Sequence, residues 1–201
     1  MIKYTHACVR LEDDGKVLVI DPGTFSEPEA LDGVTDVLVT HEHADHIDVD
    51  RLCDVHGLRI FTNAQLAAQL EGFHVTTVAV GQTFTAAGFE VKAVGGHHAE
   101  IFDGLPGCAN VGFIVNDLVY HPGDSLFVPD QDIEHLLVPS SGPWLKLGEA
   151  LGFVRAVRPR RAYPIHEVML SETGLESFGR WMGMKGETDY RRLDAGEHAT
   201  L

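Results

Sequence analysis

Apolar and polar positions along the chain follow the periods of an α/β protein. Helical spacing of apolar residues predicts four helices, over 49–56, 64–70, 147–157 and 171–182. Short apolar runs bounded by Gly, Pro, Asn and Asp predict the strands, at 2–11, 16–21, 37–40, 59–62, 75–80, 83–85, 89–94, 110–115, 118–120, 135–138 and 161–165. Strands precede helices in two successive runs, which favours two packed sheets with helices outside. We find no repeat or linker, so 1–201 is predicted to be one domain with a polar, structureless tail after about 184.

One short stretch concentrates the chemistry of the chain. After the apolar run 37–39, the segment Thr40–His46 places three imidazoles and a carboxylate in six positions, as H-x-H-x-D-H. Imidazole suits zinc, iron, copper or nickel, and a carboxylate adds an oxygen ligand and general-base capacity. A single histidine here would be an ordinary solvated turn residue. The whole string predicts a metal site.

Three more strand ends carry groups that can bind a metal. They are Gly95-Gly96-His97-His98, then Gly123-Asp124, then His166 after the last strand. In layered α/β folds, ligand sites lie beyond the carboxyl ends of strands. Seven potential ligands from separate segments are therefore enough for two metals that share a bridging carboxylate.

Composition narrows the partners and the compartment. Lys and Arg number 15 against 30 Asp and Glu, a formal charge of −15, which argues against long nucleic acids and anionic membranes. Twelve histidines agree with a metal protein. Three widely spaced cysteines and the absence of an apolar leader predict a cytoplasmic protein without disulfides. No apolar stretch reaches the roughly 20 residues that span a bilayer.

The ordered set of motifs resembles the metallo-β-lactamase superfamily. The similarity runs from the Ile-Asp-Pro-Gly turn at 20–23 through H-x-H-x-D-H and Gly-Asp to His166. It implies an α/β, four-layer αββα sandwich of two mixed β-sheets with helices on the outer faces. The segment around His97-His98-Ala99 resembles a subgroup known mostly as metal-dependent hydrolases, whose characterised relatives include ascorbate-6-phosphate lactonase and phosphodiesterase-like enzymes.

Carried over by position, the resemblance assigns roles to individual side chains. Asp124 would bridge two metals, and Asp45 would also manage the proton of the nucleophile. His121 would donate to substrate or orient Asp124, with an ordinary turn histidine as the alternative. The first metal would take His41, His43 and His98, and the second Asp45, His46 and His166.

Several neighbouring side chains stay unranked at this stage. Asp21, Asp48 and Glu167 are candidates to orient the imidazoles, and His6 is expected in the core or beside a ligand. Trp144 either walls a pocket or packs in the core, and loops 103–108 and 139–145 are the candidate pocket walls. The remaining histidines are expected to be ordinary surface or helix-end residues: His56, His74, His135 and His198.

The resulting hypothesis is a metallohydrolase that uses a hydroxide held by two divalent ions to cleave a small ester, lactone or phosphodiester. Zinc is the expected metal, with manganese or iron as alternatives. A diiron-type redox protein and a catalytically silent metal-binding module are the alternatives from other classes, and nucleic-acid processing is less favoured. The expected partner is a small-molecule substrate, and homo-oligomerisation is left open.

Overall fold

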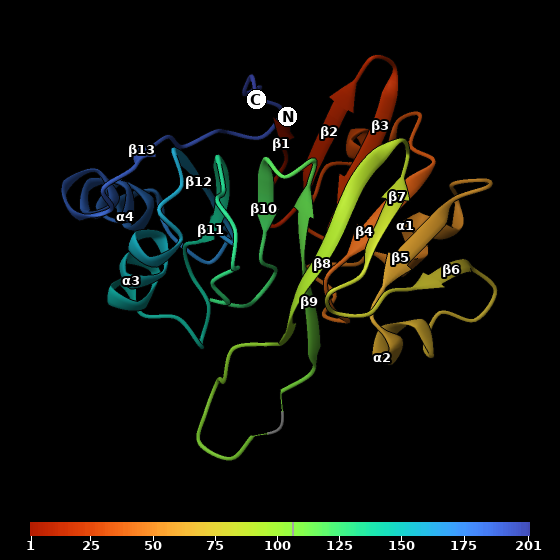
Figure 1. The fold of residues 1–201 in the computed structure, drawn as a ribbon, viewed down its shortest axis with the longest axis horizontal. Coiled ribbons are helices and arrows are strands. Elements are labelled where there is room, and N and C mark those ends of the chain that lie inside the picture. Colours follow the sequence, from red (N-terminus) through yellow and green to blue (C-terminus); the bar gives the residue numbers. More distant parts are fainter. Residues whose placement is uncertain (106) are drawn as a thin grey trace.

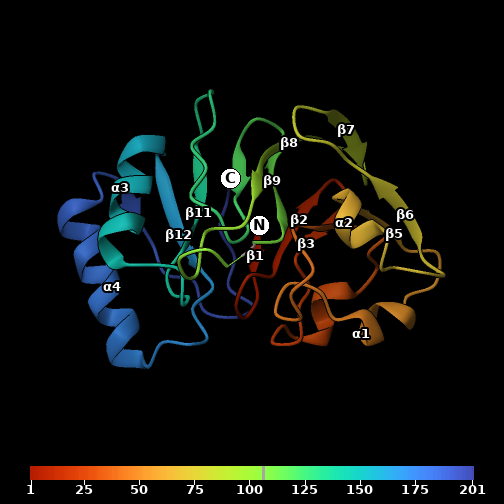
Figure 2. The ribbon, with the colours of Figure 1, turned by 90° about the horizontal axis from the view of Figure 1, so that it is seen from below.

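Two β-sheets lie face to face, with helices on both outer sides (Figures 1 and 2). The computed structural model describes residues 1–105 and 107–201. The first sheet has the order β1-β2-β3-β4-β5-β6, with β1 (Ile2–Lys3), β2 (Val9–Asp13), β3 (Lys16–Ile20), β4 (Asp36–Val39), β5 (Arg59–Thr62) and β6 (His74–Thr77). The second has the order β13-β12-β11-β10-β9-β8-β7, with β7 (Thr83–Ala86), β8 (Phe89–His97), β9 (Ala109–Val115), β10 (Val119–His121), β11 (His135–Pro139), β12 (Arg161–Ile165) and β13 (Asp189–Tyr190).

Both sheets are mixed, as the resemblance implies. Strands β1 to β3 are antiparallel, whereas β3 to β6 run parallel. In the second sheet β7 to β10 are antiparallel and β10 to β13 run parallel. The parallel halves bring the carboxyl ends of β4 and β12, which precede His41 and His166, to the site described below.

The helices flank the two sheets on opposite sides. Figure 2 shows α1 (Val49–Cys53) and α2 (Ala64–Ala67) beside the first sheet, and α3 (Leu147–Val157) and α4 (Glu172–Lys185) beside the second. A short 3₁₀ helix, Pro28–Leu31, also lies on the side of the first sheet. Asn63 caps α2 and Ser171 caps α4, as their side chains predict.

Apolar residues form three separate clusters, and these clusters correspond to the interfaces between four layers. Within β4, Leu38 faces the second sheet, whereas Val37 and Val39 join Leu52 of α1 on the outer side. Strand β11 repeats the pattern, with Leu137 facing inward and its neighbours packed under α3. Alternate side chains of a strand point to opposite faces, so continuous apolar runs are buried on both sides. The αββα architecture is therefore confirmed.

The structure corrects two parts of the strand prediction. The apolar run 2–11 is two strands, because residues 4–8 leave the sheet in a turn with His6 at φ 67°. The tail after 184 is not structureless. It adds β13 to the edge of β12 and buries Leu193 and Ala199 in the cluster between the sheets. Its apolar residues are too widely spaced to show a period, so only tertiary contacts reveal their burial.

Other differences are confined to element ends. Helices α1 and α2 are shorter than their apolar patterns suggest, ending at Cys53 and Ala67. Strand β8 continues three residues past the predicted 94 to His97. Within the described residues, no helix is both long enough and apolar enough to cross a membrane.

Candidate metal centre

The histidine string forms a bent loop directly after β4, supported by the turn after β3. The Asp21 carboxylate accepts hydrogen bonds from the Thr40 amide at 2.8 Å and from the Thr40 hydroxyl at 2.7 Å. Gly23 passes so close to the loop that a Cβ there would lie 1.9 Å from the Asp45 carbonyl oxygen. Only glycine fits at this position, so the Asp-Pro-Gly turn allows the close approach that the loop requires.

The metal-capable side chains gather in two adjacent groups, each with its candidate ligand atoms within 4.8 Å of one another. The first group contains His41, His43, His98 and Asp124, and the second contains His6, Asp45, His46 and His166. All seven residues proposed from the sequence are in these groups, and His6 is an addition. His97 is exposed at the end of β8 and lies outside both groups.

Asp124 belongs to the first group but also contacts the second. Its Oδ2 atom is 3.2 Å from His98 Nε2 of the first group and 3.2 Å from His166 Nε2 of the second. Its Oδ1 atom is 3.1 Å from His46 Nε2. The side chain is buried, so both carboxylate oxygens are held within reach of both groups.

Several of these buried atoms lack the hydrogen bonds that buried polar atoms normally make. Among the described residues, Asp124 Oδ1, His46 Nε2 and His166 Nε2 have no hydrogen-bond partner. His46 Nε2 nevertheless lies 3.1 Å from Asp124 Oδ1, and His166 Nε2 lies 3.2 Å from Asp124 Oδ2. The distances are short but the alignment is not that of a hydrogen bond. Unpaired nitrogen and oxygen atoms that converge in one buried place are the donor set that a cation would satisfy. The residues therefore fit divalent metal ions.

The electrostatics of the two groups differ. Burial and the neighbouring His46 lower the pKa of His41 well below its usual range, and burial and the neighbouring His98 lower that of His43, so these two imidazoles of the first group are neutral. In the second group burial opposes protonation, but the carboxylates of Asp124 and Asp45 raise the pKa of His166 to about 9. Burial likewise disfavours the ionised form of Asp124, yet the charge of His46 keeps the pKa of that carboxyl well below its usual range. The carboxylates thus stay ionised at neutral pH.

Outer partners hold the imidazoles in place. His98 Nδ1 lies 2.6 Å from the Ala99 carbonyl oxygen, and the Thr40 hydroxyl lies 3.0 Å from His41 Nδ1. Of the three unranked acids, Asp21 contacts His46 Nδ1 at 2.7 Å. Asp48 instead caps α1, and Glu167 accepts a hydrogen bond from the His6 amide.

Trp144 is buried, as core packing predicts, yet it also borders the centre. Its Nε1 atom lies 3.2 Å from Asp124 Oδ2, within hydrogen-bonding distance. Its indole contacts the rings of His98 and His166 edge-on, at 5.8 and 5.9 Å between centroids. Core packing of Trp144 is therefore confirmed, and its indole edge also meets the metal-capable side chains.

The structure revises the role of His121. Its ring is fully buried, with Nε2 2.8 Å from the Ala7 carbonyl oxygen and Nδ1 accepting a hydrogen bond from the Gly123 amide. Neither nitrogen is left for a substrate, so its catalytic assignment is replaced by support of the turn before Asp124. His135 is also not a surface residue, since it is buried against Tyr163. Burial by distant strands leaves no local pattern for either histidine.

The four-layer fold and the histidine-rich strand ends define an αββα protein with a candidate metal centre. A family model described as a beta-lactamase superfamily domain matches residues 1–166. Protein Rv0786c of Mycobacterium tuberculosis is 39% identical over 178 residues, covering 84% of this chain and 84% of its own length. The chain therefore belongs to the beta-lactamase superfamily, as a hydrolase of the metallo-β-lactamase fold.

Two further similarities agree with this membership. The UPF0173 metal-dependent hydrolase MJ1163 of Methanocaldococcus jannaschii is 27% identical over 181 residues, covering 81% of this chain and 82% of its own. The structure of Igni18, described as a novel metallo hydrolase from Ignicoccus hospitalis, has a TM-score of 0.78 at 22% identity. That alignment covers 98% of this chain and 95% of the other, and it supports the fold.

Proposed function

We propose that the protein is a metal-dependent hydrolase that holds two divalent ions and cleaves small esters, lactones or phosphodiesters. The observation that carries the proposal is the pair of side-chain groups joined by Asp124, with the unpaired buried Oδ1 atom of Asp124 in the first and unpaired buried imidazole nitrogens in the second. Two such ions supply a hydroxide nucleophile near neutral pH and stabilise the charge that develops on the attacked centre. Zinc is our first choice because imidazole dominates the set, with manganese and iron as alternatives.

In this proposal the protein's own residues hold the ions and the nucleophile. His41, His43 and His98 hold one ion and Asp45, His46 and His166 the other, with Asp124 shared. Asp45 is the only half-exposed member of its group, so its carboxylate is open to a nucleophile and can manage its proton. Burial opposes the ionised form of Asp45, but its contacts with the imidazoles of His166 and His6 keep the pKa of this carboxyl below its usual range, so the carboxylate stays ionised.

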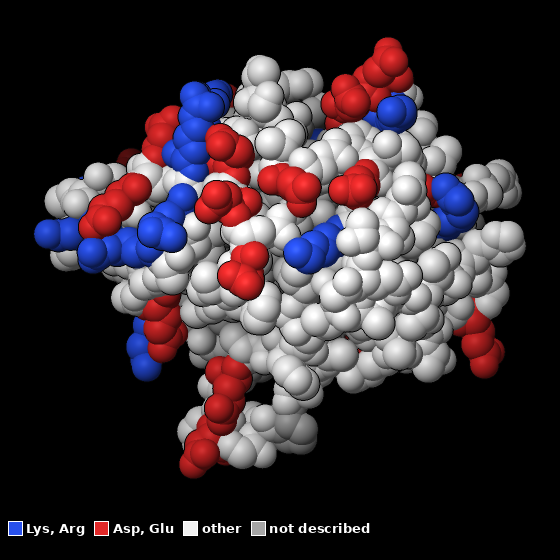
Figure 3. Space-filling view, in the orientation of Figure 1, with Lys and Arg blue, Asp and Glu red and all other residues white. Residues whose placement is uncertain are grey.

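The charge around the centre supports a small substrate. The loop that follows His98 projects from the body of the molecule, and its charged residues, Glu100 and Asp103, are both acidic (Figures 1 and 3). Position 106 of the predicted wall 103–108 lies outside the described residues. Lys146, the basic residue next in sequence to the predicted wall 139–145, is exposed, and its Nζ atom lies 3.5 Å from Glu149 Oε1. A polyanion would meet net repulsion at these residues.

Exposed apolar side chains on the loop after His98 and beside His6 indicate the character of that substrate. Ile101, Phe102 and Leu105 of the same loop are 45%, 70% and 55% exposed. Phe25 is 49% exposed and contacts the His6 ring edge-on at 5.3 Å between centroids. We therefore propose a small, weakly charged and partly apolar substrate. We also propose a cytoplasmic location, supported by three free cysteines.

The test combines metal analysis with a substrate panel. Protein purified without chelator is assayed by elemental analysis, then the metal-loaded protein is incubated with chromogenic esters, lactones and phosphodiesters and with a tRNA precursor. We expect close to two equivalents of metal and turnover within the panel alone. Asp45→Ala, reloaded with excess zinc, should remain slow. A protein that takes up no zinc, manganese or iron would refute the metal centre, and efficient tRNA processing with no panel activity would refute the substrate class.

A further inference from the structure

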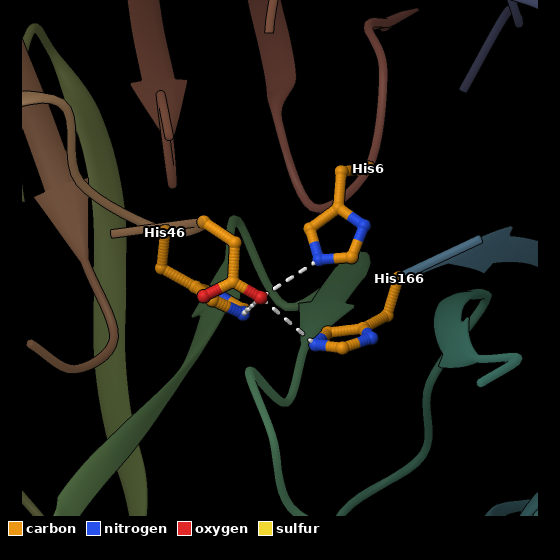
Figure 4. A group of neighbouring side chains, drawn as sticks. His6, His46 and His166 are labelled. Atoms are coloured by element: carbon orange, nitrogen blue, oxygen red, sulfur yellow. Dashed lines mark hydrogen bonds and ion pairs between the residues drawn. The ribbon is translucent and has the colours of Figure 1, made fainter. Parts of the chain in front are cut away.

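His6 is a buried histidine from the turn between β1 and β2 that joins the second group. Its side chain is 1% exposed, and its Nε2 atom lies 3.0 Å from Asp45 Oδ2. His166 Nε2 lies 3.3 Å from the same oxygen, and the two rings are 4.0 Å apart between centroids. Figure 4 shows His6 and His166 directed at this carboxylate from one side. One oxygen of Asp45 is therefore enclosed by two imidazoles.

Both of these histidines have an unfavourable backbone conformation. The φ angle is 67° at His6 and 59° at His166, in the left-handed region. This region is sterically unfavourable for a residue with a Cβ, and it persists where the surroundings impose it. The two turns are joined, since the His166 amide donates to the His6 carbonyl oxygen at 3.3 Å. The position of one ring thus depends on that of the other.

A buried ion pair holds these two turns together. Lys3 is 1% exposed, and its Nζ atom donates to the His6 carbonyl oxygen at 2.7 Å and to Glu167 Oε1 at 2.9 Å, as well as to the Tyr4 carbonyl oxygen. Glu167 Oε1 also accepts a hydrogen bond from the His6 amide at 2.8 Å. Lysine is almost never fully buried without a partner.

The contacts of the Lys3–Glu167 pair indicate a role beyond stability. Replacing a buried ion pair by apolar residues is often neutral or stabilising, so stability alone is a weak reason for one. Among the described residues, every acceptor of the Lys3 Nζ atom lies in the turn that carries His6 or on the residue after His166. The pair therefore orients the two imidazoles that contact Asp45.

We propose that His6 is a positioning residue of the second metal site, and that the Lys3–Glu167 pair holds His6 and His166 against the Asp45 carboxylate. The Nε2–H of His6 donates to Asp45 Oδ2 and restricts rotation of that carboxylate. The proposal rests on the proposed metal centre. It assigns the turn 4–8, which interrupts the first-sheet edge, the function of delivering His6.

The experiment measures metal affinity without substrate. Wild type, His6→Gln, Lys3→Met, Glu167→Gln and the Lys3→Met/Glu167→Gln double variant are loaded with Zn²⁺ and titrated with a chromogenic chelator that resolves the two equivalents. Co²⁺ loading adds a visible spectrum that reports ligand geometry. The control is His135→Gln, since His135 is also a buried histidine with an unpaired Nδ1 atom, at the amino end of β11 away from the centre.

We expect His6→Gln to bind two equivalents but to release the weaker one about 10–100-fold more readily. The single variants of the ion pair, Lys3→Met and Glu167→Gln, should weaken binding of the same metal equivalent. The double variant should bind it little worse than either single variant, because the two residues act as a unit. The first equivalent and the His135→Gln control should stay unchanged. If His6→Gln unfolds, His6→Asn replaces it, because asparagine tolerates the left-handed backbone and keeps an N–H donor.

Three results would overturn the proposal. Unchanged affinity of both equivalents in His6→Gln would remove the role of His6. Complete loss of one equivalent, as expected for a direct ligand, would make His6 a ligand instead of a positioning residue. If Lys3→Met and Glu167→Gln weaken the binding of both metal equivalents equally and also lower the Tm, the ion pair is purely structural. Failure of wild type to bind metal would instead refute the proposed function.

Discussion

The Asp21 carboxylate lies 2.7 Å from His46 Nδ1, although 25 residues separate the two in sequence. Thr40 donates to the same carboxylate through its amide and its hydroxyl, so Asp21 is held in place before it meets the imidazole. A carboxylate on Nδ1 keeps a proton there, so the nitrogen that His46 would offer to a metal is Nε2, which lies 3.1 Å from Asp124 Oδ1. Asp21 therefore sets the tautomer that a metal ligand needs.

Asp21→Ala should lower metal affinity about 10–100-fold, because it removes the partner that orients His46. Competition with a fluorescent chelator measures this directly. Asp48→Ala is the matched control, since Asp48 caps α1 through the Arg51 amide at 3.1 Å and contacts no imidazole. The control should lose about 1 kcal/mol of folding stability and keep its metal. An equal loss of metal in both variants would contradict the assignment.

Replacing the adjacent histidines 97 and 98 by alanine should have opposite effects. His98 is buried and 3.2 Å from Asp124, whereas His97 points to solvent from the last position of β8. His98→Ala should lose at least one metal equivalent and its turnover. His97→Ala should keep both within about twofold, in line with the small effects of surface substitutions. If His98→Ala kept its metal and His97→Ala lost it, the ligand would be His97 instead of His98.

Trp144→Phe should slow turnover about 10- to 100-fold, because it removes an N–H donor to the charged Asp124 while keeping an aromatic ring. Hydrogen bonds to charged groups contribute about 1.5–3 kcal/mol. Trp181→Phe is the control, since it alters the other tryptophan of the chain, which is 42% exposed on α4. The readout is kcat at saturating metal. An unchanged kcat in Trp144→Phe would leave the indole with packing alone.

The metal-free protein should lose stability as the pH rises from about 6.5 to 9. Neighbouring carboxylates raise the pKa of His166 to about 9 in the folded state despite its burial, against about 6.5 when unfolded. A histidine whose pKa is raised by folding stabilises the folded state fully at pH values below its unfolded pKa of about 6.5. This stabilisation is lost as the pH rises through the pKa of the folded state. At about 1.4 kcal/mol per pKa unit, the loss from His166 alone is at most about 3.5 kcal/mol.

Urea denaturation of the metal-free protein at several pH values measures this loss. The pKa of His46 is also raised, by Asp124 and Asp21 against the effect of its burial, so it adds in the same direction. Zinc should reverse the trend, because metal ligands bind as neutral imidazoles and metal affinity rises with pH. A metal-free protein whose stability rises over this range would contradict the prediction.

The candidate centre was largely predictable because its chemistry is local in sequence. The string from His41 to His46 follows a strand that is apolar on both faces. Three imidazoles clustered at the end of such a buried strand predict a metal site. The layer order followed from the same runs, since Val37, Leu38 and Val39 are all buried, on alternating sides of one sheet.

The remaining features depend on contacts between distant segments. The apolar run 2–11 carries no signal for the break at His6, because its left-handed backbone is imposed by Glu167 and Lys3. His121 sits in the Gly-Asp motif region and resembles a catalytic residue by position, but the Ala7 carbonyl oxygen occupies its Nε2 atom. Neither partner is near in sequence, so no local pattern could have revealed them.

The two groups of side chains also lie on the seam between the sheets. His41 and His46 follow β4 of the first sheet, whereas Asp124 and His166 follow β10 and β12 of the second. A bound ion would therefore have ligands in both sheets, and it could form its full set of bonds only when they are docked. By mass action, a ligand that binds only the docked state stabilises that state. Metal loading would thus strengthen the docking of the two sheets beyond what their shared apolar cluster provides, and chelation would remove that added stabilisation.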